Sequence, residues 1–119
     1  MGLPLHDIDN LIEQLRDFAE DRDWSQFHSP KNLAMALTVE AAELLEQFQW
    51  LSESESSSLQ REKLAQVEEE MADVFLYLLR MSDVLDIDLV AAANRKIKKN
   101  NEKYPADQVR GSSKKYNEY

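Results

Sequence analysis

The sequence predicts an all-α protein, a small bundle of four helices joined by short loops. The 119-residue chain contains only two glycines and three prolines, which leaves few interruptions between helices. Apolar residues recur at steps of three and four almost throughout, and β-branched residues are sparse. A chain of this length has room for one domain with a modest core.

The first half of the chain predicts two helices separated by an aromatic loop. The first should run from about Asp7 to Asp23, because one apolar stripe continues over this range. Residues 23–28 interrupt the stripe and predict an ordered loop that carries aromatic side chains. The second helix should begin after Ser29, a capping residue, with Pro30 in its first turn, and continue to about Leu51.

The second half predicts two further helices. The polar, low-complexity residues 52–58 predict a flexible loop. The third helix is the clearest, because apolar steps of three and four alternate from Leu64 to Leu85. The fourth should begin at Asp88, a capping residue, and end at Pro105. We therefore expect a helical domain over residues 1–104 and a loosely structured, locally basic tail over residues 105–119.

Composition argues against several classes of protein and indicates self-association. The formal net charge of −9 disfavours a general nucleic-acid binder, which needs a basic surface. Neither a membrane span nor a signal-peptide pattern is visible, so we expect a cytoplasmic protein. Cysteine is absent, which excludes disulfides, zinc–thiolate sites and thiol nucleophiles. Apolar residues on more than one helix face predict oligomers built from a dimeric unit.

Two pairs of acidic residues carry the strongest functional signal. Glu40 and Glu43 are three residues apart on the second helix, as are Glu70 and Asp73 on the third, and Glu46 extends the first row. Positions i and i+3 share a helical face, so each pair points in one direction. In an antiparallel arrangement the pairs lie ~12 and ~16 Å from the connecting turn, nearly level. Four converging carboxylates repel one another, and Mg²⁺ relieves that repulsion and bridges to phosphates.

These acidic residues also allow other interpretations. With 23 acidic residues in mostly helical sequence, pairs at this spacing also arise by chance. Both pairs, however, lie among alanine, leucine, methionine and valine, where charges are rare unless paired or bound to metal. A di-iron carboxylate bundle would need Glu-x-x-His on two helices, and that motif is missing, since His6 follows Leu3 and His28 follows Ser25 at that spacing.

Aromatic and basic residues indicate how a nucleotide would be bound. Aromatic rings stack on nucleobases, and the candidates for such contacts are Tyr77, Trp24, Phe27, His28 and Trp50. On the fourth helix, a stripe of polar and basic side chains suits triphosphate oxygens. It consists of Lys96, Asn100 and Lys103, with Tyr104 beside them. The alternatives are core packing for the rings, helix capping for His28 and a solvated basic face for the stripe.

Three motifs follow one another along the chain. They are residues 22–33 (RDWSQFHSPKNL), 40–50 (EAAELLEQFQW) and 69–74 (EEMADV), and residues 100–105 and 112–116 extend the match. Together they resemble the MazG-like all-α nucleoside triphosphate pyrophosphohydrolases, with the closest likeness to the dCTP pyrophosphatase branch. The metal motif of that family is Glu-Glu-x-x-Glu, a spacer and Glu-x-x-Asp. Here Val39 stands in place of the first glutamate, as in dCTPase-like members.

The resemblance implies a fold, an activity and a set of site residues. Members of the family have the all-α MazG fold, form tight dimers and often tetramers, and clean the nucleotide pool. They cut an NTP or dNTP to the monophosphate and pyrophosphate with carboxylate-bound Mg²⁺. The metal ligands implied are Glu40, Glu43, Glu70 and Asp73. The base and sugar would contact Trp24, Trp50 and Tyr77, with His28 nearby, and the phosphates would contact Lys96, Asn100, Lys103 and Tyr104.

The resulting hypothesis is Mg²⁺-dependent hydrolysis of a nucleotide such as dCTP at the α–β linkage. Glu43 or Glu46 would accept the proton of the attacking water, and removing any of the four metal ligands should abolish turnover. Two alternatives belong to other classes. One is a non-catalytic helical interaction module, and the other is a sensor that binds nucleotides without turnover. Measuring pyrophosphate release from a panel of NTPs and dNTPs separates the three.

Overall fold

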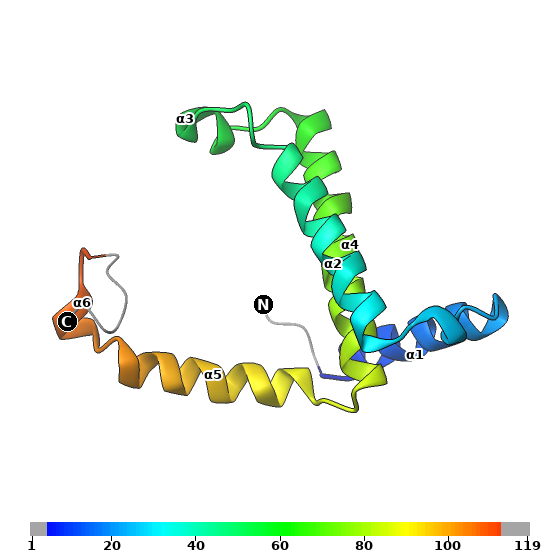
Figure 1. The fold of residues 1–119 in the computed structure, drawn as a ribbon. Helices are drawn as coiled ribbons and strands as arrows, with labels where there is room; N and C mark the ends of the chain where they lie inside the picture. Colours follow the sequence, from blue (N-terminus) through cyan, green and yellow to red (C-terminus); the bar gives the residue numbers. More distant parts are fainter. Residues whose placement is uncertain (1–4, 113–119) are drawn as a thin grey trace. The chain divides into compact units, whose positions relative to one another are not determined.

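The computed structural model describes residues 5–112, and every regular element in that range is helical, which confirms the predicted all-α class. The chain divides into two compact units, residues 1–86 and 87–119 (Figure 1). No helix in the described range is long and apolar enough to cross a membrane. The elements are α1 (Leu5–Asp21), the 3₁₀ helix η1 (Ser25–Phe27), α2 (Pro30–Glu46), α3 (Glu53–Ser56), α4 (Arg61–Val84), α5 (Leu89–Lys103) and α6 (Ala106–Val109).

An antiparallel pair of helices, α2 and α4, forms the framework of the first unit. The two helices lie side by side, and α1 packs across the C-terminal end of α4 (Figure 1). Four apolar side chains of the described residues are buried in this unit: Ala19 on α1, Leu33 on α2, and Val67 and Leu79 on α4. The core therefore lies where α1, α2 and α4 meet.

The end of α1 differs from the prediction, because the helix stops at Asp21 rather than Asp23. Asp23 adopts the left-handed conformation with a φ of 55°. Its N–H donates to the carbonyl of Glu20 (3.0 Å), and the N–H of Trp24 donates to the carbonyl of Ala19 (2.8 Å). This bonding pattern is a Schellman motif, in which the left-handed position usually carries glycine. The Trp24 ring then packs edge-on against Phe18, with 5.7 Å between ring centroids.

The segment that follows is ordered, as expected, and it contains the short helix η1. The side-chain amide of Gln26 donates to both the carboxylate and the backbone carbonyl of Asp23, each at 3.0 Å. The side chain of Asn32 donates to the carbonyl of Phe27 at 3.0 Å. These bonds tie the segment to the end of α1 and to the first turn of α2.

The two predicted helix caps, Ser29 and Asp88, are confirmed. The Ser29 hydroxyl accepts from the N–H of Asn32 at 3.1 Å, with Pro30 in the first turn of α2. The carboxylate of Asp88 accepts from the N–H of Ala91 at 3.0 Å and caps α5. Each cap satisfies a backbone donor that has no partner within its own helix.

Two predictions about the connection between α2 and α4 are wrong. α2 ends at Glu46 rather than near Leu51, and the N–H groups of Gln47, Phe48 and Leu51 instead donate to the third preceding carbonyl. Residues 52–58 were expected to be a flexible loop, but they contain α3. Ser52 and Glu55 form a capping box: the Ser52 hydroxyl accepts from the N–H of Glu55 (3.1 Å), and the Glu55 carboxylate accepts from the N–H of Ser52 (2.9 Å).

The second unit consists of α5 and α6. α5 ends at Lys103, just before Pro105, as predicted. The segment expected to be a loose tail begins with the single helical turn of α6, and residues 113–119 lie outside the described range. The division at residue 104 therefore stays a prediction.

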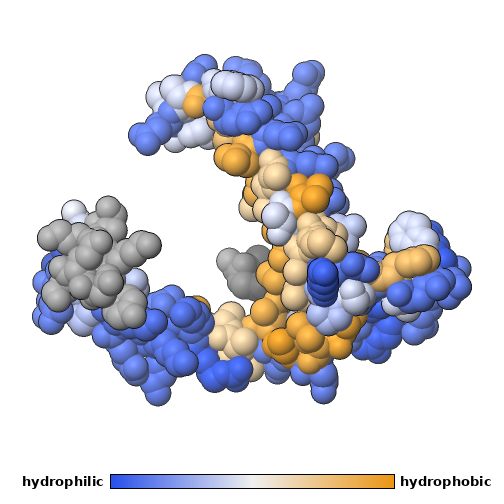
Figure 2. All heavy atoms as spheres, viewed as in Figure 1, coloured by the Kyte–Doolittle hydropathy of each residue, from blue (hydrophilic) through white to orange (hydrophobic). Residues whose placement is uncertain are grey.

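The apolar seam predicted on α4 is only partly buried. Val67 is buried, whereas four residues spaced seven apart are exposed, and Figure 2 shows apolar surface gathered over the α2–α4 pair. The exposed fractions are 47% for Leu64, 56% for Met71, 37% for Leu78 and 42% for Leu85. Residues at this spacing share one helix face, so we refer to these four residues as the α4 apolar stripe.

Candidate functional site

Three glutamates meet between α2 and α4. Glu40 and Glu43, one turn apart on α2, and Glu70 on α4 each present a carboxylate oxygen, and these oxygens all lie within 4.8 Å of one another. The antiparallel pairing of the two helices brings them level, as the sequence register indicated. We refer to these three residues as the glutamate cluster.

The glutamate cluster is electrostatically unfavourable without a cation. Partial burial raises the pKa of Glu40 to about 7, and the neighbouring negative charges of Glu43, Asp73 and Glu70 add to the effect. Burial, followed by Glu43 and Asp73, also raises the pKa of Glu70. Like charges held close together disfavour ionisation because each carboxylate repels the others.

Two oxygens of the glutamate cluster lack a hydrogen-bond donor. Oε2 of Glu40 and Oε2 of Glu70 are both buried, and neither accepts a hydrogen bond from the described part of the chain. Buried acceptors are almost always satisfied in proteins. Converging, unsatisfied carboxylate oxygens are the donor set that a hard divalent cation prefers, so these residues fit Mg²⁺.

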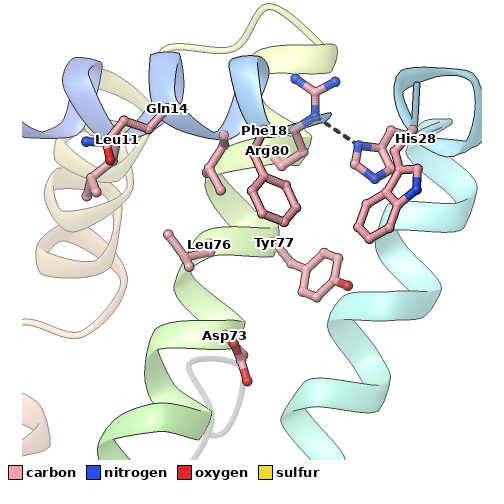
Figure 3. Close-up of a pocket in the computed structure, with 10 residues that line it drawn as sticks. Leu11, Gln14, Phe18, His28, Asp73, Leu76, Tyr77 and Arg80 are labelled. Atoms are coloured by element: carbon pink, nitrogen blue, oxygen red, sulfur yellow. Dashed lines mark hydrogen bonds between the residues drawn. The ribbon is translucent and has the colours of Figure 1, made fainter. Parts of the chain in front are cut away.

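A pocket of about 450 Å³ lies between α1, the segment before α2 and α4 (Figure 3). Its volume lies within the range typical of small-molecule sites. α1 contributes Leu11, Gln14, Leu15 and Phe18, the segment before α2 contributes Trp24 and His28, and α4 contributes Asp73, Leu76, Tyr77 and Arg80. Asp73 is exposed and does not belong to the glutamate cluster. It nevertheless links the pocket to the cluster, because its negative charge raises the pKa of both Glu40 and Glu70.

A chain of polar contacts lies at the other end of the pocket from Asp73 (Figure 3). Arg80, only 8% exposed, donates from Nε to Nδ1 of His28 at 3.0 Å and from Nη1 to Asp83 at 3.2 Å. Arg16 binds the same aspartate through two hydrogen bonds, of 3.1 and 2.6 Å. The bonds from Arg16 hold the pKa of Asp83 below its usual range. Burial and the adjacent Arg80 lower the pKa of His28.

The structure brings together only some of the residues predicted to bind substrate. Trp24, His28 and Tyr77 line the pocket, whereas Phe27 and Trp50 do not. Trp50 lies in the turn after α2 and is 87% exposed. Its role in binding a base stays a prediction.

Other predicted residues lie away from the pocket or in the second unit. Glu46, the last residue of α2, is exposed and lies outside the glutamate cluster. The polar stripe lies along α5 in the second unit, where Lys96, Asn100 and Lys103 are exposed and Tyr104 is half-buried. Contact of this stripe with phosphates stays a prediction.

Sequence reasoning missed Arg80. Two signals were present in the sequence. Arg80 is a charged residue within the apolar run Leu78-Leu79-Arg80-Met81. It also follows Asp73 by seven residues and Tyr77 by three, which places all three on one helix face. The α1 side chains of the pocket carried no comparable signal, since an apolar stripe on a helix predicts core packing equally well.

The chain matches one protein family and is similar to curated proteins. Residues 35–119 match the MazG-like family. The chain is 42% identical over 105 residues to dCTP pyrophosphatase 1 of Homo sapiens, covering 86% of this chain and 61% of that protein. It is 41% identical over 102 residues to dCTP pyrophosphatase 1 of Rattus norvegicus, covering 84% of this chain and 60% of that one. The chain thus spans about 60% of the length of these curated relatives.

A solved structure is also similar. The crystal structure of a pyrophosphatase from Archaeoglobus fulgidus matches with a TM-score of 0.80 and 42% sequence identity. The match covers 88% of this chain and 98% of that one.

Proposed function

Because the chain belongs to the MazG-like family, we propose that it is a nucleoside triphosphate pyrophosphohydrolase, with a dCTP-like nucleotide as its preferred substrate. The single observation that carries the proposal is the glutamate cluster, with two buried, unpartnered oxygens beside a nucleotide-sized pocket. The names of the similar proteins, dCTP pyrophosphatase 1 and a pyrophosphatase, support the same reaction and base.

We assign the glutamate cluster and Asp73 to a divalent cation, with Mg²⁺ as the natural choice. When bound, such a cation neutralises triphosphate charge and acidifies a coordinated water. The raised pKa of Glu40, about 7, supports this assignment, because a cation offsets both the burial and the repulsion that disfavour the ionised carboxylate.

The remaining roles fall to side chains around the cation site. The rings of Trp24 and Tyr77 would hold the base, since both line the pocket. Glu43 would accept the proton of the water that attacks at the α–β linkage, and the pyrophosphate leaves. Glu43 is a better candidate than Glu46 because it belongs to the glutamate cluster. The polar stripe of α5 and Trp50 would complete the contacts with phosphates and base.

A matched set of variants tests the reaction. The purified protein is incubated with a panel of NTPs and dNTPs, with Mg²⁺ or with EDTA, and the release of pyrophosphate and monophosphate is measured. We expect Mg²⁺-dependent turnover that is lost in Glu70→Gln and kept in Glu53→Gln, which changes an exposed residue of α3. If nucleotides bind but no product forms, the protein is a sensor. If nucleotides neither bind nor react, it is an interaction module. Either result contradicts the proposal.

We also propose that the protein assembles as a dimer or as a tetramer of paired dimers. The α4 apolar stripe supports this, because an exposed apolar row at seven-residue spacing is typical of a helix that packs against another chain. Analytical ultracentrifugation should find a dimer or tetramer at micromolar concentration. Met71→Lys should shift the population toward monomer, and Glu62→Lys, at an exposed position of the first turn of α4, should not. A monomeric parent protein would contradict the assignment.

A further inference from the structure

Arg80 is a buried cation to which the proposed reaction assigns no role. It is 8% exposed, lies on the pocket wall, and contacts one acidic and one neutral partner, Asp83 and His28. A buried guanidinium is costly unless its donors are satisfied. Asp83 supplies the balancing charge, and Arg16 fixes Asp83 from the other side. The position of the Arg80 side chain is therefore strongly determined.

This contact determines which nitrogen of His28 carries the proton. Arginine has only N–H donors and no acceptor. Since Nε of Arg80 lies 3.0 Å from Nδ1 of His28, Nδ1 must accept and cannot itself be protonated. In the neutral ring the proton is then on Nε2. His28 lines the pocket, and its Nε2–H is on the far side of the ring from Arg80 (Figure 3).

The position of His28 indicates which part of a nucleotide it would meet. Asp73, Tyr77 and Arg80 follow one another on a single face of α4, so Arg80 lies ~10 Å along the helix from Asp73. Asp73 is the pocket residue whose charge affects Glu40 and Glu70, so its end of the pocket is the carboxylate end. His28 and Arg80 lie away from Asp73, at the other end of the pocket (Figure 3). If phosphates occupy the carboxylate end, the base occupies the end where His28 lies.

We propose that Arg80 is a positioning residue that fixes His28 as an N–H donor, and that this donor selects bases by a hydrogen-bond acceptor on their edge. A pyrimidine O2 carbonyl is an acceptor of this kind. The inference rests on the proposed function, because it places the phosphates at the glutamate cluster. A single donor held at a fixed place discriminates between bases, since only a base that puts an acceptor at that place satisfies the donor.

Nitrogen NMR of the imidazole rings tests the first step without any turnover. The sequence contains two histidines, and a His6→Gln variant assigns the signals. At neutral pH we expect His28 to show a bare Nδ1 and a protonated Nε2. Arg80→Gln should give a mixture of tautomers, whereas Arg61→Gln, which changes an exposed arginine at the start of α4, should leave His28 as it is. A protonated Nδ1 in the parent protein, or an unchanged tautomer in Arg80→Gln, overturns the inference.

Nucleotide binding tests the second step. Dissociation constants for the four deoxynucleoside monophosphates are measured by calorimetry in the parent protein, Arg80→Gln and His28→Phe. We expect both variants to reduce the ratio between the best and the worst base by about tenfold, the effect of one buried hydrogen bond. If Arg80→Gln does not fold, as judged by circular dichroism, Arg80→Lys replaces it, because lysine keeps the charge but loses the fixed direction of the donor.

The two proposals fail in different ways. Base-selective binding without release of pyrophosphate would contradict the proposed reaction and leave the role of Arg80 standing. Pyrophosphate release with a base preference that neither variant changes would contradict the role of Arg80 alone.

Discussion

If the glutamate cluster binds a cation as proposed, the raised pKa of Glu40 should make this binding depend on pH near neutrality. With a pKa of about 7, the Glu40 carboxyl is protonated at lower pH and ionised at higher pH. About a tenth of the molecules carry ionised Glu40 at pH 6 and about nine-tenths at pH 8. A divalent cation needs the ionised form, so its apparent affinity should rise about tenfold across these two pH units.

Isothermal titration with Mn²⁺ or Mg²⁺ at pH 6, 7 and 8 measures this rise directly. Glu40→Gln keeps the shape of the side chain but cannot ionise, so the variant should bind more weakly and lose most of the pH dependence. Glu53→Gln on α3 is the matched control, because it removes one negative charge far from the cluster in sequence and should leave the slope unchanged. An affinity that is constant from pH 6 to 8, or a slope that persists in Glu40→Gln, would refute the reasoning.

Three other predictions follow from single residues. Without divalent cations, the folded chain binds the Glu40 proton more tightly than the unfolded chain, because the pKa of Glu40 is raised to about 7. The free energy of unfolding, measured by urea melts, should therefore fall as the pH rises from about 4.5 to about 7. Glu40→Gln should flatten this decline. Leu79→Ala should lower the free energy of unfolding by about 2–5 kcal/mol in the same assay, because Leu79 is 1% exposed; a loss below 1 kcal/mol would show that the site is not core. Asp23→Ala should cost about 1 kcal/mol and Asp23→Gly close to nothing, because only glycine adopts the left-handed conformation freely; equal costs would contradict this.

The parts of the fold that local chemistry determines could be predicted from the sequence. The caps at Ser29 and Asp88 each depend on one side chain and a backbone donor three residues later, so the sequence contains the whole interaction. The meeting of Glu40, Glu43 and Glu70 depends only on helical spacing and an antiparallel hairpin, both of which are visible in the sequence.

Features that combine distant segments or opposing local preferences were harder to predict. The Ser52–Glu55 capping box lies within a serine-rich stretch whose composition suggests disorder, and composition outweighed the four-residue motif. The contact between Arg80 and His28 joins residues 52 positions apart and depends on how α1 and α2 pack against α4. The spacing of residues along a single helix cannot predict a contact of this kind.

Asp23 has a consequence for the nucleotide pocket that extends beyond the stability of α1. An aspartate in this left-handed position strains the backbone, but its carboxylate gives Gln26 an acceptor that glycine could not provide. The same turn carries Trp24 and leads to His28, both on the pocket wall. The aromatic side of the site is therefore positioned from two directions, by a helix terminus at the surface and by the buried Arg80. Asp23→Gly, which removes this acceptor at almost no cost in stability, should therefore alter ligand recognition even though the melting temperature hardly changes.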